Sequence, residues 1–173
     1  MPEQFITSAR SLVGQPIEFY SSFISYSTKD QDFADRLFAD LQTKCVRCWF
    51  APHDAQRERK LHEQIDEAIR MHEKLLLILS PHSMNSEWVK TEIVKARKRE
   101  VREKTQILFP VSLVPYEPSI RDWECFDADT GKDSAREIRE YLIADFSNWK
   151  DHESYQKEFV LLLRDLQSKR RAT

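Results

Sequence analysis

The feature of this sequence that most constrains its fold is the alternation of short apolar runs with segments of helical periodicity. The clearest run is KLLLILS, residues 74–80, which is typical of a central parallel strand that is buried on both faces. A helical pattern follows it, with Val89, Ile93 and Ala96 on one stripe. Parallel strands need such crossover connections, which pack right-handed. The chain is therefore predicted to be a doubly wound α/β protein.

The same alternation extends over most of the chain. The strand-like stretches are residues 17–27, 45–51, 74–80, 106–114 and 141–146. The helical patterns between and after them include residues 29–44, 61–73 and 154–171. Five strands that alternate with helices predict a five-stranded parallel sheet with helices on both faces. Ligands of such sheets bind outside the carboxyl ends of the strands, which directs attention to the loops after Tyr26, Phe50 and Leu79.

Length and composition favour one compact domain. The chain has 173 residues, of which 40% are hydrophobic, and this is enough for an ordinary core. We expect a tail or linker at 1–16, the domain at 17–168 and a basic tail at 169–173. No apolar run is long enough to span a bilayer, and the N-terminus lacks the blocks of a signal peptide. A cytoplasmic location is expected.

Charge and glycine content exclude several classes. The net charge of −2, from 27 basic and 29 acidic residues, leaves no overall electrostatic footprint for nucleic acid. The basic run KARKREVREK, residues 95–104, is better explained as a solvated helix face than as a nucleic-acid contact. The two glycines, Gly14 and Gly131, are too few for G-x-G-x-x-G or a Walker A loop.

Metal, redox and acyl-transfer chemistry find little support. Three cysteines do not make a disulfide framework, and Cys45 and Cys48 fall in a predicted strand where they would point to opposite faces. We therefore expect structural thiols. The five histidines show no metal-ligand spacing, and no G-x-S-x-G occurs.

Glu92 lies beside the predicted buried stripe of its helix, with Trp88 one turn earlier on the same side. Periodicity alone favours a simple interpretation, in which Glu92 is a solvated glutamate that pairs with Lys95 and Trp88 covers the start of the helix.

Four stretches carry a resemblance to a known family: FISYSTKDQDFADRLFADL, CWFAPHD, KLHEQIDEAI and LLLILSPHSMNSEWVKTEI. In order and spacing they resemble the boxes of the Toll/interleukin-1 receptor (TIR) domain, most closely its bacterial NAD-cleaving members. The match spans about residues 17–165, and its most specific parts are FISYS and the SPxSxxSxWxxxE run. The resemblance implies a flavodoxin-like sheet, in agreement with the alternation described above.

The resemblance also implies an activity. Many TIR domains cleave the nicotinamide bond of NAD⁺, and the glutamate of the W-x-x-x-E segment, here Glu92, is the catalytic residue. Trp88 is the tryptophan of that segment. By the same resemblance, the first strand's end and the stretch from Phe50 to Asp54 contribute near the substrate, which adds Tyr26, Ser27, Phe50 and Asp54. NAD⁺ would be the substrate, with no cofactor and no metal. Trp88 would either stack on a base of the substrate or pack against the neighbouring loop.

One carboxylate suffices for this chemistry. Ordinary glycosidases use two carboxyl groups, because the leaving oxygen must be protonated. In NAD⁺ the nicotinamide is attached to the ribose as a pyridinium cation. It therefore departs as a neutral molecule, and no general acid is required. A fixed carboxylate stabilises the positive charge that develops on the ribose. The product, free ADP-ribose or a cyclic ADP-ribose isomer, is left open.

The resemblance also implies self-association through TIR–TIR contacts, and contacts with other domains or partner TIR proteins. The loop DAQRERKL, residues 54–61, lacks the glycine that is usual there in the family, which affects both the loop geometry and the mode of association. Its arginines would neutralise the pyrophosphate of NAD⁺ or, as the composition favours, simply be solvated. Besides an NAD⁺-consuming enzyme of signalling or defence, two alternatives remain: a non-enzymatic docking module and a regulator that binds a nucleotide without cleaving it.

Overall fold

A computed structural model describes residues 18–53, 73–126, 128 and 130–167. Its centre is a five-stranded parallel sheet in the order β2-β1-β3-β4-β5. The strands are β1 (Ser22–Ser27), β2 (Cys48–His53), β3 (Lys74–Leu79), β4 (Leu108–Ser112) and β5 (Ala144–Asp145). The described helical segments are η1 (Thr28–Asp30), α2 (Gln31–Thr43), α4 (Glu87–Glu103), η2 (Tyr116–Ile120), α5 (Ser134–Ile138) and α6 (His152–Asp165). The predicted flavodoxin-like α/β fold is confirmed.

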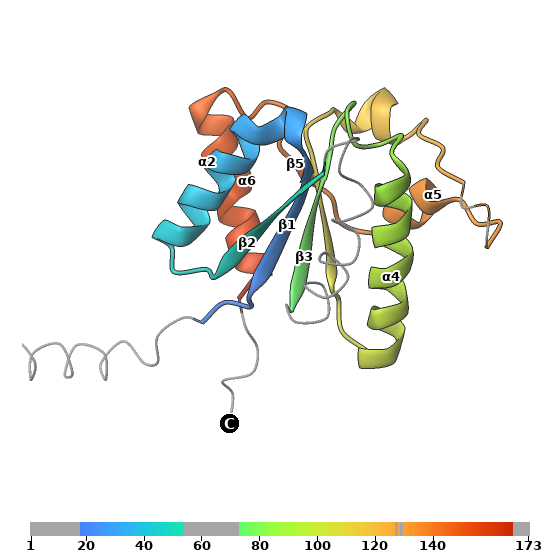
Figure 1. The fold of residues 1–173 in the computed structure, drawn as a ribbon. Coiled ribbons are helices and arrows are strands. Elements are labelled where there is room, and N and C mark those ends of the chain that lie inside the picture. The colour runs from blue at the N-terminus through green and yellow to red at the C-terminus, as the bar shows by residue number, and fades with distance from the viewer. Residues whose placement is uncertain (1–17, 54–72, 127, 129, 168–173) are drawn as a thin grey trace, which may run out of the picture.

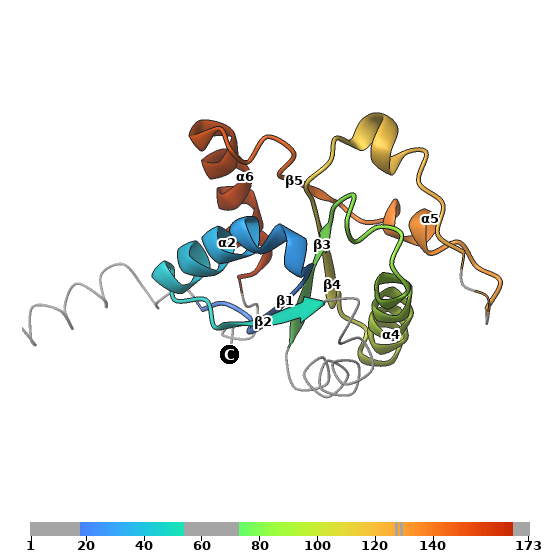
Figure 2. The ribbon, with the colours of Figure 1, turned by 45° about the horizontal axis from the view of Figure 1, so that its top comes forward.

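Helices cover both faces of the sheet. In Figures 1 and 2, α2 and α6 lie on one side, here called the α2 face, and α4 and α5 lie on the other, the α4 face. Each face has its own apolar core, and the strands contribute alternate residues to the two. In β3, for example, Leu77 belongs to the core of the α4 face and Leu76 to the core of the α2 face. This explains why LLLIL, residues 75–79, is apolar throughout.

The same alternation in β1 and β2 places two polar side chains on the α4 face of the sheet. Phe23 of β1 and Ala51 of β2 belong to the core of the α4 face. The side chains two residues further along each strand, Ser25 and His53, share that face because strand side chains repeat with a period of two. Both are buried. The strands therefore present polar side chains to α4 near their carboxyl ends.

Several predicted boundaries differ from the structure. The second strand begins three residues later than predicted and continues through Pro52 to His53. A proline is tolerated here because β2 is an edge strand that pairs only with β1 in the described sheet. The fifth strand is only Ala144–Asp145. The predicted helix at 61–73, apart from Glu73, lies outside the described residues, as do the tails at 1–16 and 169–173.

The prediction that Cys45 and Cys48 fall in one strand is wrong. Cys45 is exposed in a turn with a φ of 66°, whereas Cys48 opens β2 and is buried. Among the described residues, no group of three His, Cys, Asp or Glu side chains is placed to hold a metal ion. None of the helices described here is long and apolar enough to cross a membrane.

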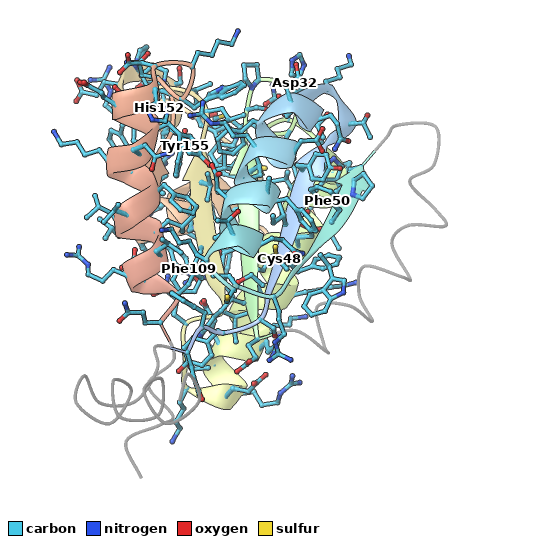
Figure 3. The ribbon with its side chains drawn as sticks, turned by 90° about the vertical axis from the view of Figure 1, so that its left-hand side faces the viewer. Asp32, Cys48, Phe50, Phe109, His152 and Tyr155 are labelled. Carbon is cyan, nitrogen blue, oxygen red and sulfur yellow. The ribbon has the colours of Figure 1, made fainter. Side chains whose placement is uncertain are left out.

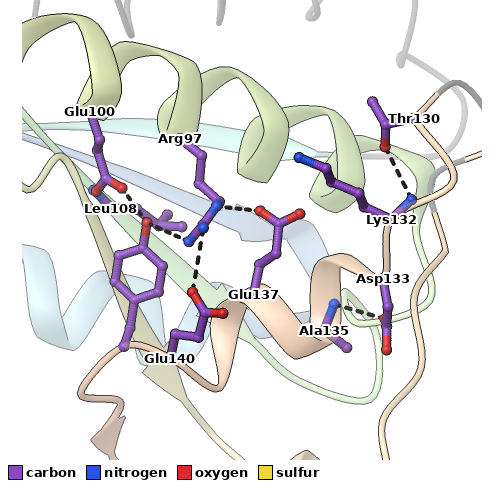
Figure 4. Close-up of polar contacts among 10 residues, drawn as sticks. Arg97, Glu100, Leu108, Thr130, Lys132, Asp133, Ala135, Glu137 and Glu140 are labelled. Atoms are coloured by element: carbon purple, nitrogen blue, oxygen red, sulfur yellow. Dashed lines mark hydrogen bonds and ion pairs between the residues drawn. The ribbon is translucent and has the colours of Figure 1, made fainter.

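The basic run 95–104 contributes to the fold of the α4 face and is not simply a solvated surface. Figure 4 shows the Arg97 guanidinium between Glu137 and Glu140, both of which it pairs with. Glu100, on the same helix, accepts hydrogen bonds from the phenol of Tyr141 and from the two backbone N–H groups that lead into β4. These contacts join α4 to the segment that contains α5.

Candidate functional site

Glu92 is a buried side chain of α4 that lies against the sheet. The residue is 1% exposed. Its two carboxylate oxygens, Oε1 and Oε2, lie 2.8 and 2.6 Å from the hydroxyl oxygen of Ser25. Oε1 also lies 2.9 Å from Nε2 of His53. The interpretation that Glu92 is a solvated glutamate paired with Lys95 is therefore wrong.

His53 and Trp88 complete the cluster. The imidazole of His53 is stacked on the indole of Trp88, with ring centroids 3.7 Å apart and planes within 2° of each other. Nε2 of His53 lies 3.0 Å from the Ser25 hydroxyl. Four buried side chains from two strands and one helix thus meet at one place, and we call Ser25, His53, Trp88 and Glu92 the glutamate cluster.

The positions of the protons in this cluster follow from donor and acceptor chemistry. An ionised carboxylate only accepts hydrogen bonds, and a serine hydroxyl donates one. If Nε2 of His53 carried no hydrogen, its lone pair would face Oε1 of Glu92 at 2.9 Å. With Glu92 ionised, Nε2 is therefore assigned as an N–H donor, and Ser25 donates its own hydrogen to the carboxylate. Both donors then serve Glu92.

Local hydrogen bonds fix the segment that connects β3 to α4. The Ser83 hydroxyl donates to the carbonyl of Ile78 at 2.8 Å and accepts from the backbone N–H of Ser80 at 2.9 Å. The Ser80 hydroxyl donates to the carboxylate of Asp30, which ties this turn to the turn after β1. The indole N–H of Trp123 donates to the Met84 carbonyl at 3.0 Å. These bonds set the position from which α4 begins.

The structure does not bring all the predicted site residues together. Tyr26 follows Ser25 in β1 and so points to the α2 face, where its hydroxyl donates to Gln31 at 2.8 Å. Phe50 lies on that same face, as Figure 3 shows, and stacks on Phe38 at 4.3 Å. Neither ring is a partner of Glu92.

The other two predicted positions differ from these. Ser27 shares the face of Ser25, but its hydroxyl accepts from the backbone N–H of Lys29 and so caps η1. Asp54 lies outside the described residues. Of the six predicted residues, the structure therefore brings Glu92 and Trp88 into one cluster.

Sequence reasoning did not name Ser25, and it included His53 only as part of the stretch from Phe50 to Asp54. Ser25 had a usable signal, because the polar serines in FISYS alternate with apolar residues and so mark a polar position on one strand face. The signal for His53 was weaker, because Pro52 suggested that the strand had already ended before it. Its place became visible only when β2 was found to reach His53.

The arrangement suits a fixed carboxylate better than an activated serine. In a nucleophilic triad, one imidazole nitrogen faces the nucleophile and the other faces the acid. Here the same nitrogen, Nε2 of His53, approaches both Ser25 and Glu92. The Ser25 hydroxyl itself is directed to the carboxylate. The cluster therefore orients a negative charge and does not activate a nucleophile.

Comparison with known proteins agrees with this fold. A family model described as the TIR domain matches residues 23–159. The TIR domains of the activated Roq1 resistosome, which directly recognises the pathogen effector XopQ, share 18% identity with the chain over 84% of it and 98% of theirs, with a TM-score of 0.58. A metazoan TIR-STING receptor from C. gigas, solved with 2′,3′-cGAMP, shares 19% identity over 81% of the chain and 39% of its own length, with a TM-score of 0.50. A search of curated proteins found no match.

Proposed function

Because the chain belongs to the TIR domain family, we propose that it cleaves the nicotinamide–ribose bond of NAD⁺ and that Glu92 is its catalytic residue. Two observations support the proposal. Trp88 and Glu92 have the W-x-x-x-E spacing of NAD-cleaving members, which the sequence resembles. Glu92 is also buried, which is unusual for a glutamate, and two hydrogen-bond donors, Ser25 and His53, orient its carboxylate. The orientation of this carboxylate is the observation that carries the proposal.

The proposed reaction needs one negative charge. The bond between C1′ of the ribose and the nicotinamide nitrogen breaks, and its electron pair goes to that nitrogen, so nicotinamide leaves neutral. Positive charge develops on the ribose, where the Glu92 carboxylate stabilises it. Water then adds to C1′ and releases a proton to give ADP-ribose. If a base of the substrate adds to C1′ in place of water, no water is consumed and the product is a cyclic ADP-ribose isomer.

Glu92 must become accessible for this to happen, since it is 1% exposed. We propose that self-association through TIR–TIR contacts produces the open, active form. The resemblance to TIR domains implies such contacts, and it is consistent with a role in signalling or defence. On this view NAD⁺ is a substrate, and the chemistry needs no cofactor.

The test is to incubate the concentrated protein with NAD⁺, with and without a crowding agent, and to separate the products by chromatography. We expect nicotinamide release from the wild type and a loss of at least about 100-fold in Glu92→Ala. The matched control is Glu87→Ala. Glu87 lies five residues earlier on the same helix, its side chain is 80% exposed, and its substitution should leave the rate unchanged. The second product distinguishes the two reactions, because hydrolysis gives ADP-ribose and cyclisation gives a cyclic ADP-ribose isomer.

A docking module without enzymatic activity is the alternative. A buried carboxylate that merely stabilises the fold would make the same hydrogen bonds to Ser25 and His53. Absence of nicotinamide release in every assembled state would favour this alternative.

A further inference from the structure

The imidazole of His53 contacts Ser25, Glu92 and Trp88, and of these three contacts the proposed reaction does not yet use the one with Trp88. We propose that His53 is a positioning residue, whose Nε2–H group fixes the orientation of the Glu92 carboxylate for cleavage of NAD⁺. This inference rests on the proposed function and concerns the same site.

The first argument is the isolation of the pair. The side chains of His53 and Glu92 are each 2% exposed, and Nε2 lies 2.9 Å from Oε1. A hydrogen bond that reaches an ionised acceptor away from water is stronger than a neutral one and is not exchanged readily for a bond to solvent. The bond therefore restrains the carboxylate of Glu92.

The second argument is that the two donors divide the two oxygens. Ser25 has one hydroxyl hydrogen, and its shorter contact, 2.6 Å, is to Oε2. Of the two carboxylate oxygens, the one that His53 contacts is Oε1. With one donor on each oxygen, rotation of the carboxylate about its terminal bond breaks both bonds, whereas Ser25 alone could follow such a rotation. A carboxylate has about four acceptor sites, so lone pairs remain for a ribose hydroxyl or the developing charge.

The third argument is that α4 orients the imidazole as well as the carboxylate. Trp88 and Glu92 are four residues apart on α4 and so are neighbours on its surface. The indole of Trp88 lies flat against the imidazole at 3.7 Å, so the ring cannot turn without losing this contact. The Nε2–H bond lies in the plane of the imidazole, so the stacking keeps this bond directed at Glu92. Trp88 acts on Glu92 through His53.

Two substitutions separate the hydrogen bond from the ring stacking. In His53→Gln, the side-chain amide supplies an N–H group near the position of Nε2 but no ring. In His53→Phe, a ring remains to stack on Trp88 but the donor is gone. The control is His152→Gln, a histidine at the start of α6, on the other face of the sheet.

The kinetic readout is nicotinamide release from NAD⁺, with kcat and KM measured separately and folding checked by circular dichroism. We expect kcat of His53→Phe to fall by about 10- to 100-fold, the loss typical of one hydrogen bond to a charged group. Its KM should stay within about twofold, because in this proposal His53 acts through Glu92 and makes no contact with the substrate. His53→Gln should recover most of kcat. The proposal is overturned if folded His53→Phe keeps the kcat of the wild type, or if His53→Gln is as impaired as His53→Phe.

A second readout does not depend on catalysis. Proton–nitrogen correlation spectra of the imidazole report which ring nitrogen carries hydrogen. We expect a protonated Nε2 on His53 whose proton signal moves upfield in Glu92→Ala, where its charged acceptor is missing. An unprotonated Nε2, or a signal that does not respond, contradicts the proposal. If the wild type releases no nicotinamide, the proposed function fails, and the spectra alone then support or overturn the orientation of Glu92 by His53.

Discussion

Ser25 supplies one of the two donors that serve the buried Glu92 carboxylate, at 2.6 Å from Oε2. Removing it leaves a buried, ionised acceptor without that partner, which is more costly than losing a hydrogen bond at the surface. We predict that Ser25→Ala lowers the free energy of unfolding by about 1–3 kcal/mol. Urea denaturation measures this change. The control is Ser86→Ala, just before α4, where the side chain makes no capping hydrogen bond, and we expect a change within about 0.5 kcal/mol. A Ser25→Ala variant as stable as the control would show that the hydroxyl is not a partner of Glu92.

Glu92 also shows where local sequence patterns stop being informative. Its position beside the stripe of Val89 and Ile93 was visible in the sequence, yet periodicity favoured a solvated side chain. The residue is buried because Ser25, 67 positions away, and His53, 39 positions away, provide donors across the sheet. Such contacts depend on strand order and strand ends, which helical periodicity does not encode. Only the resemblance to TIR domains pointed to Glu92.

At the scale of elements, a buried phenol of α6 contacts two charged side chains of α2. The hydroxyl of Tyr155 donates to the carboxylate of Asp40 at 2.6 Å, and the guanidinium of Arg36 lies 3.7 Å above its ring. Figure 3 shows Tyr155 on the side of α6 that faces α2. Burial raises the pKa of the Tyr155 phenol, and the hydrogen bond to Asp40 raises it further. The folded state therefore retains this proton at a pH where the unfolded chain loses it.

The sign of the resulting pH dependence is clear. A group whose pKa is higher in the folded state contributes stability that is fully present below its unfolded pKa, about 10 for tyrosine, and is lost as the pH rises toward the folded pKa. We predict that the free energy of unfolding falls above about pH 10 and that it falls less steeply in Tyr155→Phe. Denaturation at several pH values measures the slope. Tyr116→Phe, at a site that is 45% exposed, should keep the slope of the wild type, and an equal slope in Tyr155→Phe contradicts the argument.

The elements were predicted better than their ends. Five strands could be placed along the chain from apolar runs such as KLLLILS, because a strand buried on both faces has a strong signal. The end of β2 was missed because Pro52 normally interrupts a strand, and edge position, which permits it, is a property of the sheet. The fifth strand was overestimated, since its apolar residues Leu142 and Phe146 lie outside Ala144–Asp145. Leu142 is largely exposed, and Phe146 is buried after the strand.

For the whole molecule, the central consequence of a buried Glu92 is that activity should depend on assembly. If self-association opens the site, nicotinamide release per mole of protein will rise with protein concentration. The rise should follow the fraction of oligomer measured by sedimentation at the same concentrations. A specific activity that stays constant while the oligomer fraction rises, or a fully active monomer, would falsify the dependence on assembly, though not the role of Glu92.

The measurement that tests the central claim most directly concerns the charge of Glu92 and not its presence. Glu92→Gln keeps the size of the side chain and an oxygen that accepts from Ser25 or His53, but it removes the negative charge. Nicotinamide release from NAD⁺ should be compared for the wild type, Glu92→Gln and the exposed control Glu87→Gln at a concentration where the protein is assembled. We predict that Glu92→Gln is at least about 100-fold slower and that Glu87→Gln matches the wild type. A folded Glu92→Gln protein that releases nicotinamide at nearly the wild-type rate would contradict the account.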